Sequence, residues 1–197
     1  MRPGTIADSE NSMTTALILI DAQQSFVRRP YYSSRDVGSY LEAQNALLAG
    51  ATARKIPIVR IFHVEPEPES HFSASSGLIR PMDGLREVDP AVTFHKSRHS
   101  ALVGSGLDVW LTQNGIRRLI VSGIRTEQCC ETTTRHASDL GYDVDYVVDA
   151  TLTFDMQHPD GSALPAHLIK QRTAAVLEGR FATVVTGEQA LERSNTH

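Results

Sequence analysis

Short apolar runs alternate along this 197-residue chain with longer stretches whose apolar residues recur at helical spacing. The apolar runs cover residues 16–20, 57–62, 118–123 and 143–148, with weaker candidates at 91–95 and 181–186. Unbroken runs of Val, Ile and Leu are typical of strands buried on both faces, as in a parallel sheet. The helical stretches cover residues 36–55, 104–115, 127–140 and 164–179. The alternation predicts an α/β fold: a three-layer α/β/α sandwich around a mostly parallel, Rossmann-like sheet of about six strands.

The length and composition favour one domain, expected over residues 15–197, after a polar and flexible extension at 1–14. The extension lacks the apolar core of a secretory signal, and Met13 is an alternative to Met1 as the start. A net charge of −4 argues against nucleic-acid and membrane-surface partners. No stretch reaches the roughly 18 apolar residues of a membrane span. The chain also has no disulfide framework, so we expect a protein of the reducing cytoplasm.

The only two cysteines of the chain, Cys129 and Cys130, stand side by side after the run at 118–123. Neighbouring cysteines do not easily pair, so no disulfide is expected. Thr126 is a candidate N-cap for the helix that carries them. The stripe expected to face the sheet consists of Cys130, Thr133 or Thr134, Ala137 and Leu140. Cys129 lies about 100° round the helix, in its first turn, where the helix N-terminus and a lysine would lower the pKa of its thiol.

Reactive side chains follow several of the expected strands at the point where each strand ends. They are Asp21, His63, His95, Lys96 and Cys129. Ligands of open α/β sheets bind beyond the carboxyl ends of the strands. A carboxylate, an ammonium and a thiol are therefore expected at one edge of the sheet. Each residue alone has an ordinary structural explanation, but together they favour catalysis.

Three motifs occur in an order and at spacings that identify a family. They are LILIDAQQSF from Leu17, FHKSRHSALVGSGLDVWL from Phe94 and LIVSGIRTEQCCETTTRHASDLGYDVDYVVDAT from Leu119. In this order they resemble the isochorismatase-like cysteine hydrolases, a superfamily that includes nicotinamidases and N-carbamoylsarcosine amidohydrolases. The resemblance extends from about Ala16 to Ala190.

The resemblance implies a site built on Cys129 as nucleophile, Asp21 as acid and base, and Lys96. It also implies a cis peptide bond between Ile124 and Arg125, with the backbone N–H groups of Arg125 and Cys129 as an oxyanion hole. The activity it implies is cleavage of a C–N bond in a small amide, carbamoyl or ureido compound through a thioester. Members are commonly oligomeric, so we expect a homo-oligomer, either a dimer or a tetramer.

The sequence departs from the metal-binding members at the second strand. Metal-binding nicotinamidases carry Asp-x-His there, whereas this chain has Ile61 at the aspartate position. We therefore expect no catalytic metal and no cofactor. Isochorismatases proper lack the cysteine, so Cys129 favours C–N over vinyl-ether cleavage. His95 and His99 are spaced like zinc ligands but lack the protease glutamate, and we interpret them as solvated or pocket-lining.

The wall of the substrate pocket is expected to include Gln23, Phe26, His63 and Arg125. Phe26 is equally suited to the core. Arg125 could bind a substrate carboxylate, or it could form a surface or inter-subunit salt bridge, and the sequence leaves both open. The irregular segment at 63–89 is long enough to cover a site.

Two other functions compete with catalysis. A relative that keeps the fold as a non-catalytic, small-molecule-binding scaffold would not need the Asp21, Lys96 and Cys129 set. A redox sensor using the adjacent thiols would need a resolving cysteine in better geometry, and the sequence contains no third cysteine.

Overall fold

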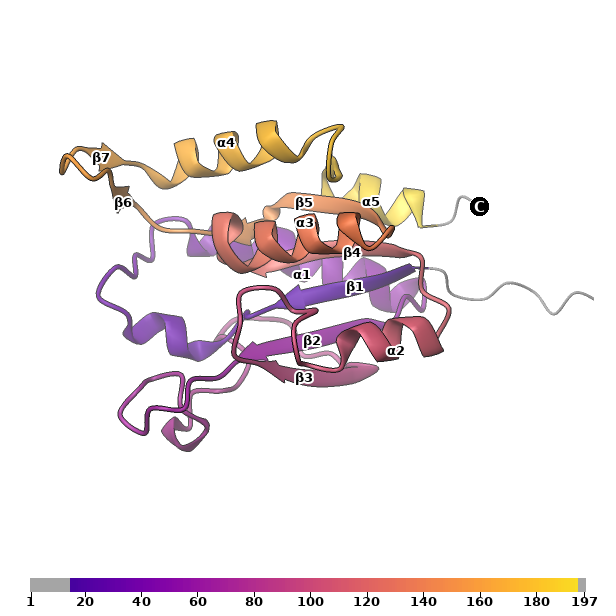
Figure 1. Cartoon of the computed structure of the whole chain (residues 1–197), viewed down its shortest axis with the longest axis horizontal. Helices are drawn as coiled ribbons and strands as arrows, with labels where there is room; N and C mark the ends of the chain where they lie inside the picture. Colours follow the sequence, from indigo (N-terminus) through magenta and orange to yellow (C-terminus); the bar gives the residue numbers. More distant parts are fainter. Residues whose placement is uncertain (1–14, 195–197) are drawn as a thin grey trace, which may run out of the picture.

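A parallel sheet of six strands forms the middle of the computed structural model, which describes residues 15–194 (Figure 1). In spatial order the strands are β3 (Val92–Lys96), β2 (Ile58–His63), β1 (Thr15–Ile20), β4 (Arg118–Ile124), β5 (Asp143–Leu152) and β8 (Thr183–Val185). Every neighbouring pair is parallel. The four strong strand predictions are confirmed. The two weaker candidates form the edge strands β3 and β8, which are only partly buried.

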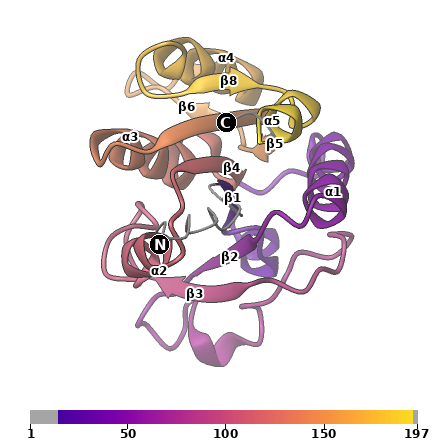
Figure 2. The same ribbon diagram turned by 90° about the vertical axis from the view of Figure 1, so that its right-hand side faces the viewer.

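Helices cover both faces of the sheet, which confirms the three-layer α/β/α fold (Figure 2). One face carries α1 (Val37–Ala53) and α5 (Gly187–Arg193). The opposite face carries α2 (Leu107–Gln113), α3 (Glu131–Asp139) and α4 (Ala166–Leu177). The stripe of α1 that is buried consists of Tyr40, Gln44, Leu47, Leu48 and Ala51. This spacing of three and four residues is the reason that the segment folds as a helix against the sheet.

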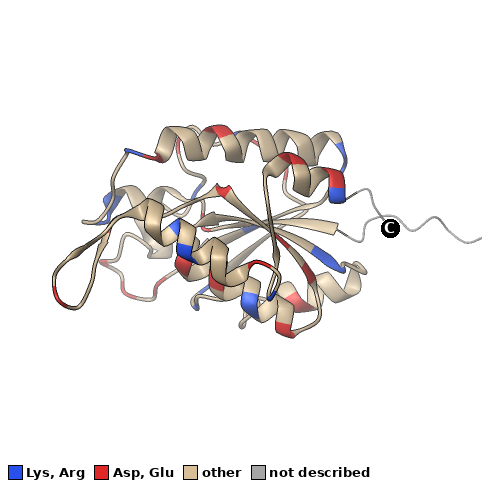
Figure 3. Cartoon of the chain, turned by 90° about the horizontal axis from the view of Figure 1, so that it is seen from above, with Lys and Arg blue, Asp and Glu red and all other residues tan. Residues whose placement is uncertain are grey.

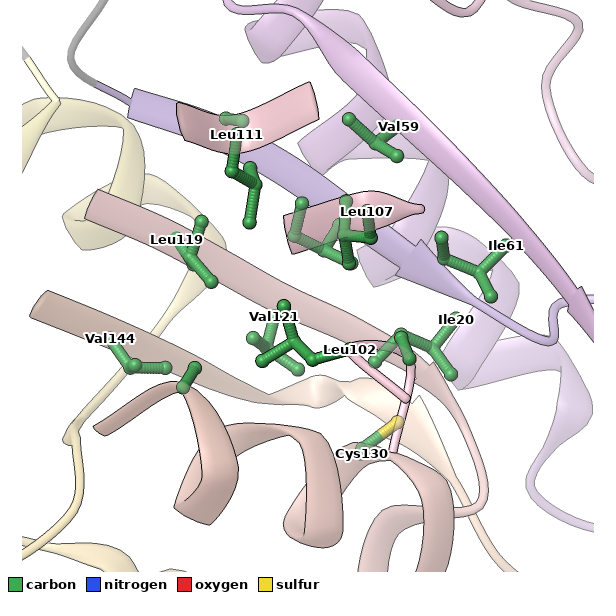
Figure 4. Close-up of a cluster of buried hydrophobic side chains, with 14 of the residues drawn as sticks. Ile20, Val59, Ile61, Leu102, Leu107, Leu111, Leu119, Val121, Cys130 and Val144 are labelled. Atoms are coloured by element: carbon green, nitrogen blue, oxygen red, sulfur yellow. The ribbon is translucent and has the colours of Figure 1, made fainter. Parts of the chain in front are cut away.

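The core on the α2 and α3 face reaches the turn that carries the cysteines (Figure 4). Leu107 and Leu111 of α2 pack there against Leu119 and Val121 of β4. Cys130 belongs to this cluster and is fully buried, as its spacing predicts. A free cysteine in such a place behaves as a small apolar side chain.

The helix after β4 differs from the prediction at both ends. It begins with a π-helical turn, Thr126–Cys130, whose N-cap is Arg125 and not Thr126. The Thr126 hydroxyl donates instead to Thr151 Oγ1 at 2.8 Å, so it ties the turn to β5. Leu140, predicted to face the sheet, is 54% exposed, because α3 ends at Asp139 and the chain turns away.

The sequence also left short elements unpredicted. These are α5, the 3-10 helices Gln24–Arg28 and Ala74–Ser76, and the hairpin of β6 (Met156–Gln157) and β7 (Ala163–Leu164). The helix expected from residue 104 starts only at Leu107, because Gly104 and Gly106 adopt positive φ angles of 68° and 89°. Such angles suit turns and not helix interiors.

Gly123 allows β1 and β4 to approach closely just below the site. Its φ is +125°, and a Cβ atom there would lie 1.9 Å from the Ile20 carbonyl oxygen. A side chain at this position would therefore push the two central strands apart. The end of β1, and with it Asp21, depends on this glycine.

The irregular segment at 63–89 leaves the carboxyl end of β2 and returns along the chain that follows β1. Gln24 N–H donates to the Arg80 carbonyl at 3.0 Å, and Met82 N–H donates to the Ala22 carbonyl at 3.0 Å. The Ser25 hydroxyl donates to the Leu78 carbonyl, also at 3.0 Å. The segment is thus anchored beside the end of the central strand.

The surface and the termini add few constraints. Acidic and basic residues are scattered over the helices and loops seen from above in Figure 3. Within residues 15–194, no helix has the length and apolar character needed to cross a membrane. The predictions for residues 1–14, including the choice between Met1 and Met13, lie outside the described residues.

Candidate active site

Three predicted residues meet at the carboxyl edge of the sheet. Asp21 directly follows β1, Lys96 ends β3, and Cys129 lies in the π-helical turn after β4. Lys96 Nζ is 2.7 Å from Asp21 Oδ2 and 3.3 Å from Cys129 Sγ. All three residues are buried, with exposures of 0%, 1% and 7% for Asp21, Lys96 and Cys129. One ammonium therefore bridges a carboxylate and a thiol away from water.

Asp21 adopts an unusual backbone conformation. Its φ is +49°, in the left-handed region that residues other than glycine rarely occupy. Asp21 N–H donates to the Ile61 carbonyl at 2.9 Å, and Gln23 N–H donates to the Asp21 carbonyl at 2.7 Å. Neighbouring backbone thus holds the conformation, and such conformations cluster at functional sites.

Burial and charge set the protonation of the three groups. Burial raises the pKa of the Asp21 carboxyl, and Lys96 opposes the rise. Burial would lower the pKa of the Lys96 ammonium, but Asp21 and Cys129 outweigh it and the pKa is raised. Burial, followed by the charge of Asp21, raises the pKa of the Cys129 thiol to about 12. The expected lowering of the thiol pKa is therefore wrong, because the charge of Lys96 does not compensate for burial beside a carboxylate.

The peptide bond between Ile124 and Arg125 is cis, which confirms this prediction. The carbonyl of Arg125 then accepts from the N–H groups of Gln128 and Cys130, both at 3.2 Å. This turn places Cys129 over the sheet edge. The oxyanion-hole role of the Arg125 and Cys129 N–H groups stays a prediction.

The Arg125 side chain is buried and already paired within the chain. Its Nη2 is 3.0 Å from Glu127 Oε1, and its Nε donates to Thr153 Oγ1 at 3.4 Å. Its guanidinium also lies 4.8 Å from the centre of the Tyr31 ring. This buried, intramolecular pair is neither the surface salt bridge nor the inter-subunit one considered from the sequence. The contact with a substrate carboxylate stays a prediction.

A cavity of about 580 Å³ opens beside this arginine. It is lined by Tyr31, Arg125, Asp155, Met156, Gln157 and Ala163. The cavity adjoins the turn of the thiol, since Arg125 immediately precedes that turn. The hairpin of β6 and β7, which the sequence did not predict, supplies three of these residues.

The other predicted pocket residues surround the triad in different ways. The Gln23 side chain is fully buried and bonds to both backbone groups of His63, as acceptor at 2.7 Å and donor at 3.1 Å. Phe26 packs edge-on against Phe72 in a buried aromatic cluster. His63 Nδ1 is 3.3 Å from Lys96 Nζ. The substrate-binding roles of Gln23, Phe26, His63 and Arg125 stay predictions.

His99 lies closer to the thiol than the sequence indicated. Both histidines are exposed, but His99 Nδ1 is 3.7 Å from Cys129 Sγ, whereas His95 contacts Phe62. The sequence signal was available, because His99 follows Lys96 by three residues in the same motif. The zinc-like spacing of His95 and His99 groups the two in the sequence, but only His99 contacts the thiol.

No three His, Cys, Asp or Glu side chains lie close enough to hold a metal ion in the part of the chain that the structure describes. Ile61, at the position of the family aspartate, is a fully buried core residue. The residues present therefore do not form the metal site of the metal-binding nicotinamidases. That the enzyme works without a metal stays a prediction.

The six-stranded parallel sheet with helices on both faces is the three-layer α/β/α fold of the isochorismatase-like superfamily. Residues 15–188 match the family model described as the isochorismatase domain, and the chain belongs to this family.

Known relatives share the fold over most of the chain. The isochorismatase family protein YrdC of Bacillus subtilis (strain 168) is 27% identical over 176 residues, covering 89% of this chain and 94% of its own. Nicotinamidase 3 of Arabidopsis thaliana is 27% identical over 163 residues, covering 74% and 76%. A crystal structure of an isochorismatase-family protein from Chromobacterium violaceum ATCC 12472 has a TM-score of 0.83 at 27% identity and covers 98% of both chains.

Proposed function

We propose that this isochorismatase-family hydrolase cleaves a C–N bond in a small amide, carbamoyl or ureido compound, with Cys129 as the nucleophile. The observation that carries the proposal is the buried Lys96 ammonium, 2.7 Å from Asp21 and 3.3 Å from the thiol. A nucleophile, a base and a charged group that orients both converge at one point. Similarity to a protein named nicotinamidase supports an amide as substrate.

In the first half of the reaction, Asp21 takes the thiol proton as Cys129 Sγ attacks the carbonyl carbon. The tetrahedral intermediate places its oxyanion against the N–H groups of Arg125 and Cys129. Preorganised donors of this kind are each worth about 100- to 1000-fold in rate. The C–N bond then breaks, and the leaving nitrogen takes the proton from Asp21 and departs as an amine or ammonia.

In the second half, Asp21 takes a proton from water, and the hydroxide attacks the thioester. The C–S bond breaks, the product leaves as an acid, and Cys129 regains its proton. Lys96 keeps its charge throughout and offsets the negative charge that moves between Asp21 and the sulfur. A thiol pKa of about 12 is consistent with this order of steps, because the thiol keeps its proton until substrate arrives.

The test is a screen for release of ammonia or amine from small amides, carbamoyl and ureido compounds. Cys129→Ala should lower kcat by at least about 1000-fold, as expected when a nucleophile is removed. Cys130→Ala is the matched control, because Cys130 is the adjacent thiol and packs in the core. It should retain activity despite a modest loss of stability. Activity retained in Cys129→Ala would overturn Cys129 as the nucleophile, whereas no activity in any wild-type assay would favour the non-catalytic scaffold.

We also retain three further proposals that the site does not address. They are a single domain over residues 15–197, a homo-oligomeric assembly as a dimer or tetramer, and a cytoplasmic location. Size-exclusion chromatography with light scattering tests the assembly directly. A monomer at micromolar concentration would contradict it.

A further inference from the structure

The Lys96 ammonium has more neighbours than protons. Besides Asp21 and Cys129, it lies 3.0 Å from the Arg98 carbonyl oxygen and 3.3 Å from His63 Nδ1. A lysine ammonium has three protons and no lone pair. A hydrogen bond between Lys96 and His63 therefore requires an unprotonated Nδ1, and the imidazole proton must be on Nε2.

The opposite side of the His63 ring supports this tautomer. His63 Nε2 faces Glu65 Oε1 at 3.8 Å. Arg29 Nη2 lies 2.6 Å from the same carboxylate oxygen, and the Ser70 hydroxyl donates to the other. A carboxylate fixed in this way attracts the Nε2 proton and leaves the Nδ1 lone pair free for Lys96.

The ring is also held through its backbone. The Gln23 amide binds the N–H and the carbonyl of His63 together. Gln23 is two residues from Asp21, so one short segment positions both the base and the backbone of His63. On β3, Lys96 lies in register with His63 of β2. The sheet thus brings the two side chains together at the ends of adjacent strands.

We propose that His63 is a positioning residue, whose neutral Nδ1 holds the Lys96 ammonium between Asp21 and Cys129. This role differs from the substrate contact expected from the sequence, and its catalytic consequence rests on the proposed function. Without the imidazole, the ammonium would keep three acceptors for three protons. It would lose its contact with the end of β2, and the flexible stem of Lys96 would be free to shift.

The charges around His63 keep it neutral at ordinary pH. Burial, followed by the Lys96 charge, lowers the pKa of His63 to about 4. His99 and Arg29 act in the same direction, and Glu65 alone opposes them. A protonated His63 would lose its acceptor and repel the ammonium. The ring is therefore suited to holding Lys96 and unsuited to transferring protons near neutrality.

One experiment tests the contact without using activity. Nitrogen NMR of the wild-type ring at pH 7 should show the Nε2–H tautomer, and Lys96→Met should raise the pKa of His63. Glu65→Gln should introduce some Nδ1–H tautomer, because the attraction for the Nε2 proton weakens. An Nδ1–H tautomer in the wild type, or a pKa of His63 that does not change in Lys96→Met, would overturn the proposal.

A second experiment tests the role, with His63→Ala compared with His63→Asn. Asparagine places an amide oxygen near the position of Nδ1, so it restores the acceptor. His63→Ala should lower kcat by about 10- to 100-fold, the size expected when a catalytic group is misplaced. KM should stay within about twofold, and His63→Asn should recover most of the loss. A raised KM with unchanged kcat would show a substrate contact instead, and unchanged kinetics would show no role.

The rate of iodoacetamide labelling at Cys129 separates this proposal from the proposed function. His63→Ala should slow labelling severalfold because the thiolate loses part of its stabilisation by Lys96, and His63→Asn should not. If the wild type hydrolyses no amide, the proposed function fails while labelling and NMR still decide the role of His63. If His63→Ala does not fold, Glu65→Gln replaces it, because the Nδ1–H tautomer that it introduces should slow labelling, whereas His63→Asn should not.

Discussion

Two buried carboxylates lie near the turn that carries the thiol, and their surroundings are opposite. Asp21 shares a single cation, Lys96, with Cys129. Glu131, at the start of α3, accepts from two arginines and a hydroxyl: Arg135 at 2.9 Å, Arg172 at 2.6 Å and Thr173 at 3.1 Å. The cluster at Glu131 satisfies its carboxylate fully and connects α3 to α4. The site leaves two acidic groups to one cation.

This contrast separates a structural ion cluster from a reactive one. The Glu131 carboxylate is surrounded by donors from α3 and α4, which is the arrangement of a structural ion cluster. Burial raises the pKa values of the Asp21 carboxyl and the Cys129 thiol, so these two groups are suited to exchanging a proton. The site therefore leaves its acidic groups incompletely paired, which keeps them reactive. The neighbouring Glu131 cluster is fully paired and holds the turn in place.

Asp21→Asn should produce the largest effect of the changes directed at this contrast. Loss of the base should reduce kcat by about 1000-fold, within the usual range for general acid–base catalysis. The same change should accelerate labelling of Cys129 by iodoacetamide at pH 8, because the Asp21 charge raises the pKa of the thiol. Turnover and labelling should thus move in opposite directions. Turnover retained in Asp21→Asn would show that Asp21 is not the base, and slower labelling would contradict the effect of its charge on the thiol pKa.

Acid pH should destabilise the protein through His63. Its pKa is about 4 in the folded protein and near 6.5 when unfolded, so the unfolded state binds more protons between these values. The contribution of His63 to the free energy of unfolding is therefore fully present above pH 6.5 and is lost as the pH falls towards 4. The full shift corresponds to about 3 kcal/mol, an upper value because the ring is 18% exposed.

Urea unfolding at pH 7 and at pH 4.5 measures this loss of stability. His63→Asn should reduce the difference between the two free energies of unfolding, since its amide does not titrate. The remaining histidines and carboxylates contribute to both proteins, so the comparison isolates His63. An equal pH dependence in the two proteins would contradict the lowered pKa.

Glu131→Gln should show that the saturated cluster acts on stability and not on chemistry. Removing one charge should cost about 2 kcal/mol, within the range for hydrogen bonds to charged groups. The loss should not be larger, because the side chains of Arg135 and Arg172 are 33% and 59% exposed and can turn to water. Urea unfolding gives the stability, and kcat per folded molecule should stay within about threefold. A loss of kcat as large as that of Asp21→Asn would remove the distinction between the two carboxylates.

The sequence predicted the sheet and the meeting of Asp21, Lys96 and Cys129 because both follow from where apolar runs end. A parallel sheet gathers the carboxyl ends of its strands, so residues placed there converge whatever the details. The sequence also predicted the edge strands, the cis peptide bond and the core position of Cys130. They depend on local spacing or on a recognisable motif.

The incorrect predictions involve burial and local turn geometry. The thiol pKa was misjudged because the sequence shows Lys96 but not the desolvation of Cys129 beside Asp21. Thr126 and Leu140 were misplaced because the π-helical turn and the helix end at Asp139 move them out of ordinary helical register. Such features depend on tertiary contacts, which a periodicity does not contain.

The pairing of Arg125 with Glu127 shows the same limit. Residues two apart do not face each other on a helix. Arg125 precedes the helix in an extended conformation, with φ −93° and ψ 150°, and this geometry allows the pair. This pair has one arginine for one carboxylate. Its charge balance is therefore intermediate between that of the Asp21, Lys96 and Cys129 site and that of the Glu131 cluster.

Glu127→Gln should therefore give a smaller and more selective effect than the other changes. The variant leaves a guanidinium without its carboxylate beside the cavity of about 580 Å³. Amides that carry a carboxylate should then gain about tenfold in kcat/KM relative to matched uncharged amides, since arginine binds carboxylates through paired hydrogen bonds. Glu127→Asp, which keeps the charge, is the control and should not change the preference. An unchanged ratio in Glu127→Gln would mean that substrate does not approach Arg125, and the cavity would then lie outside the substrate path.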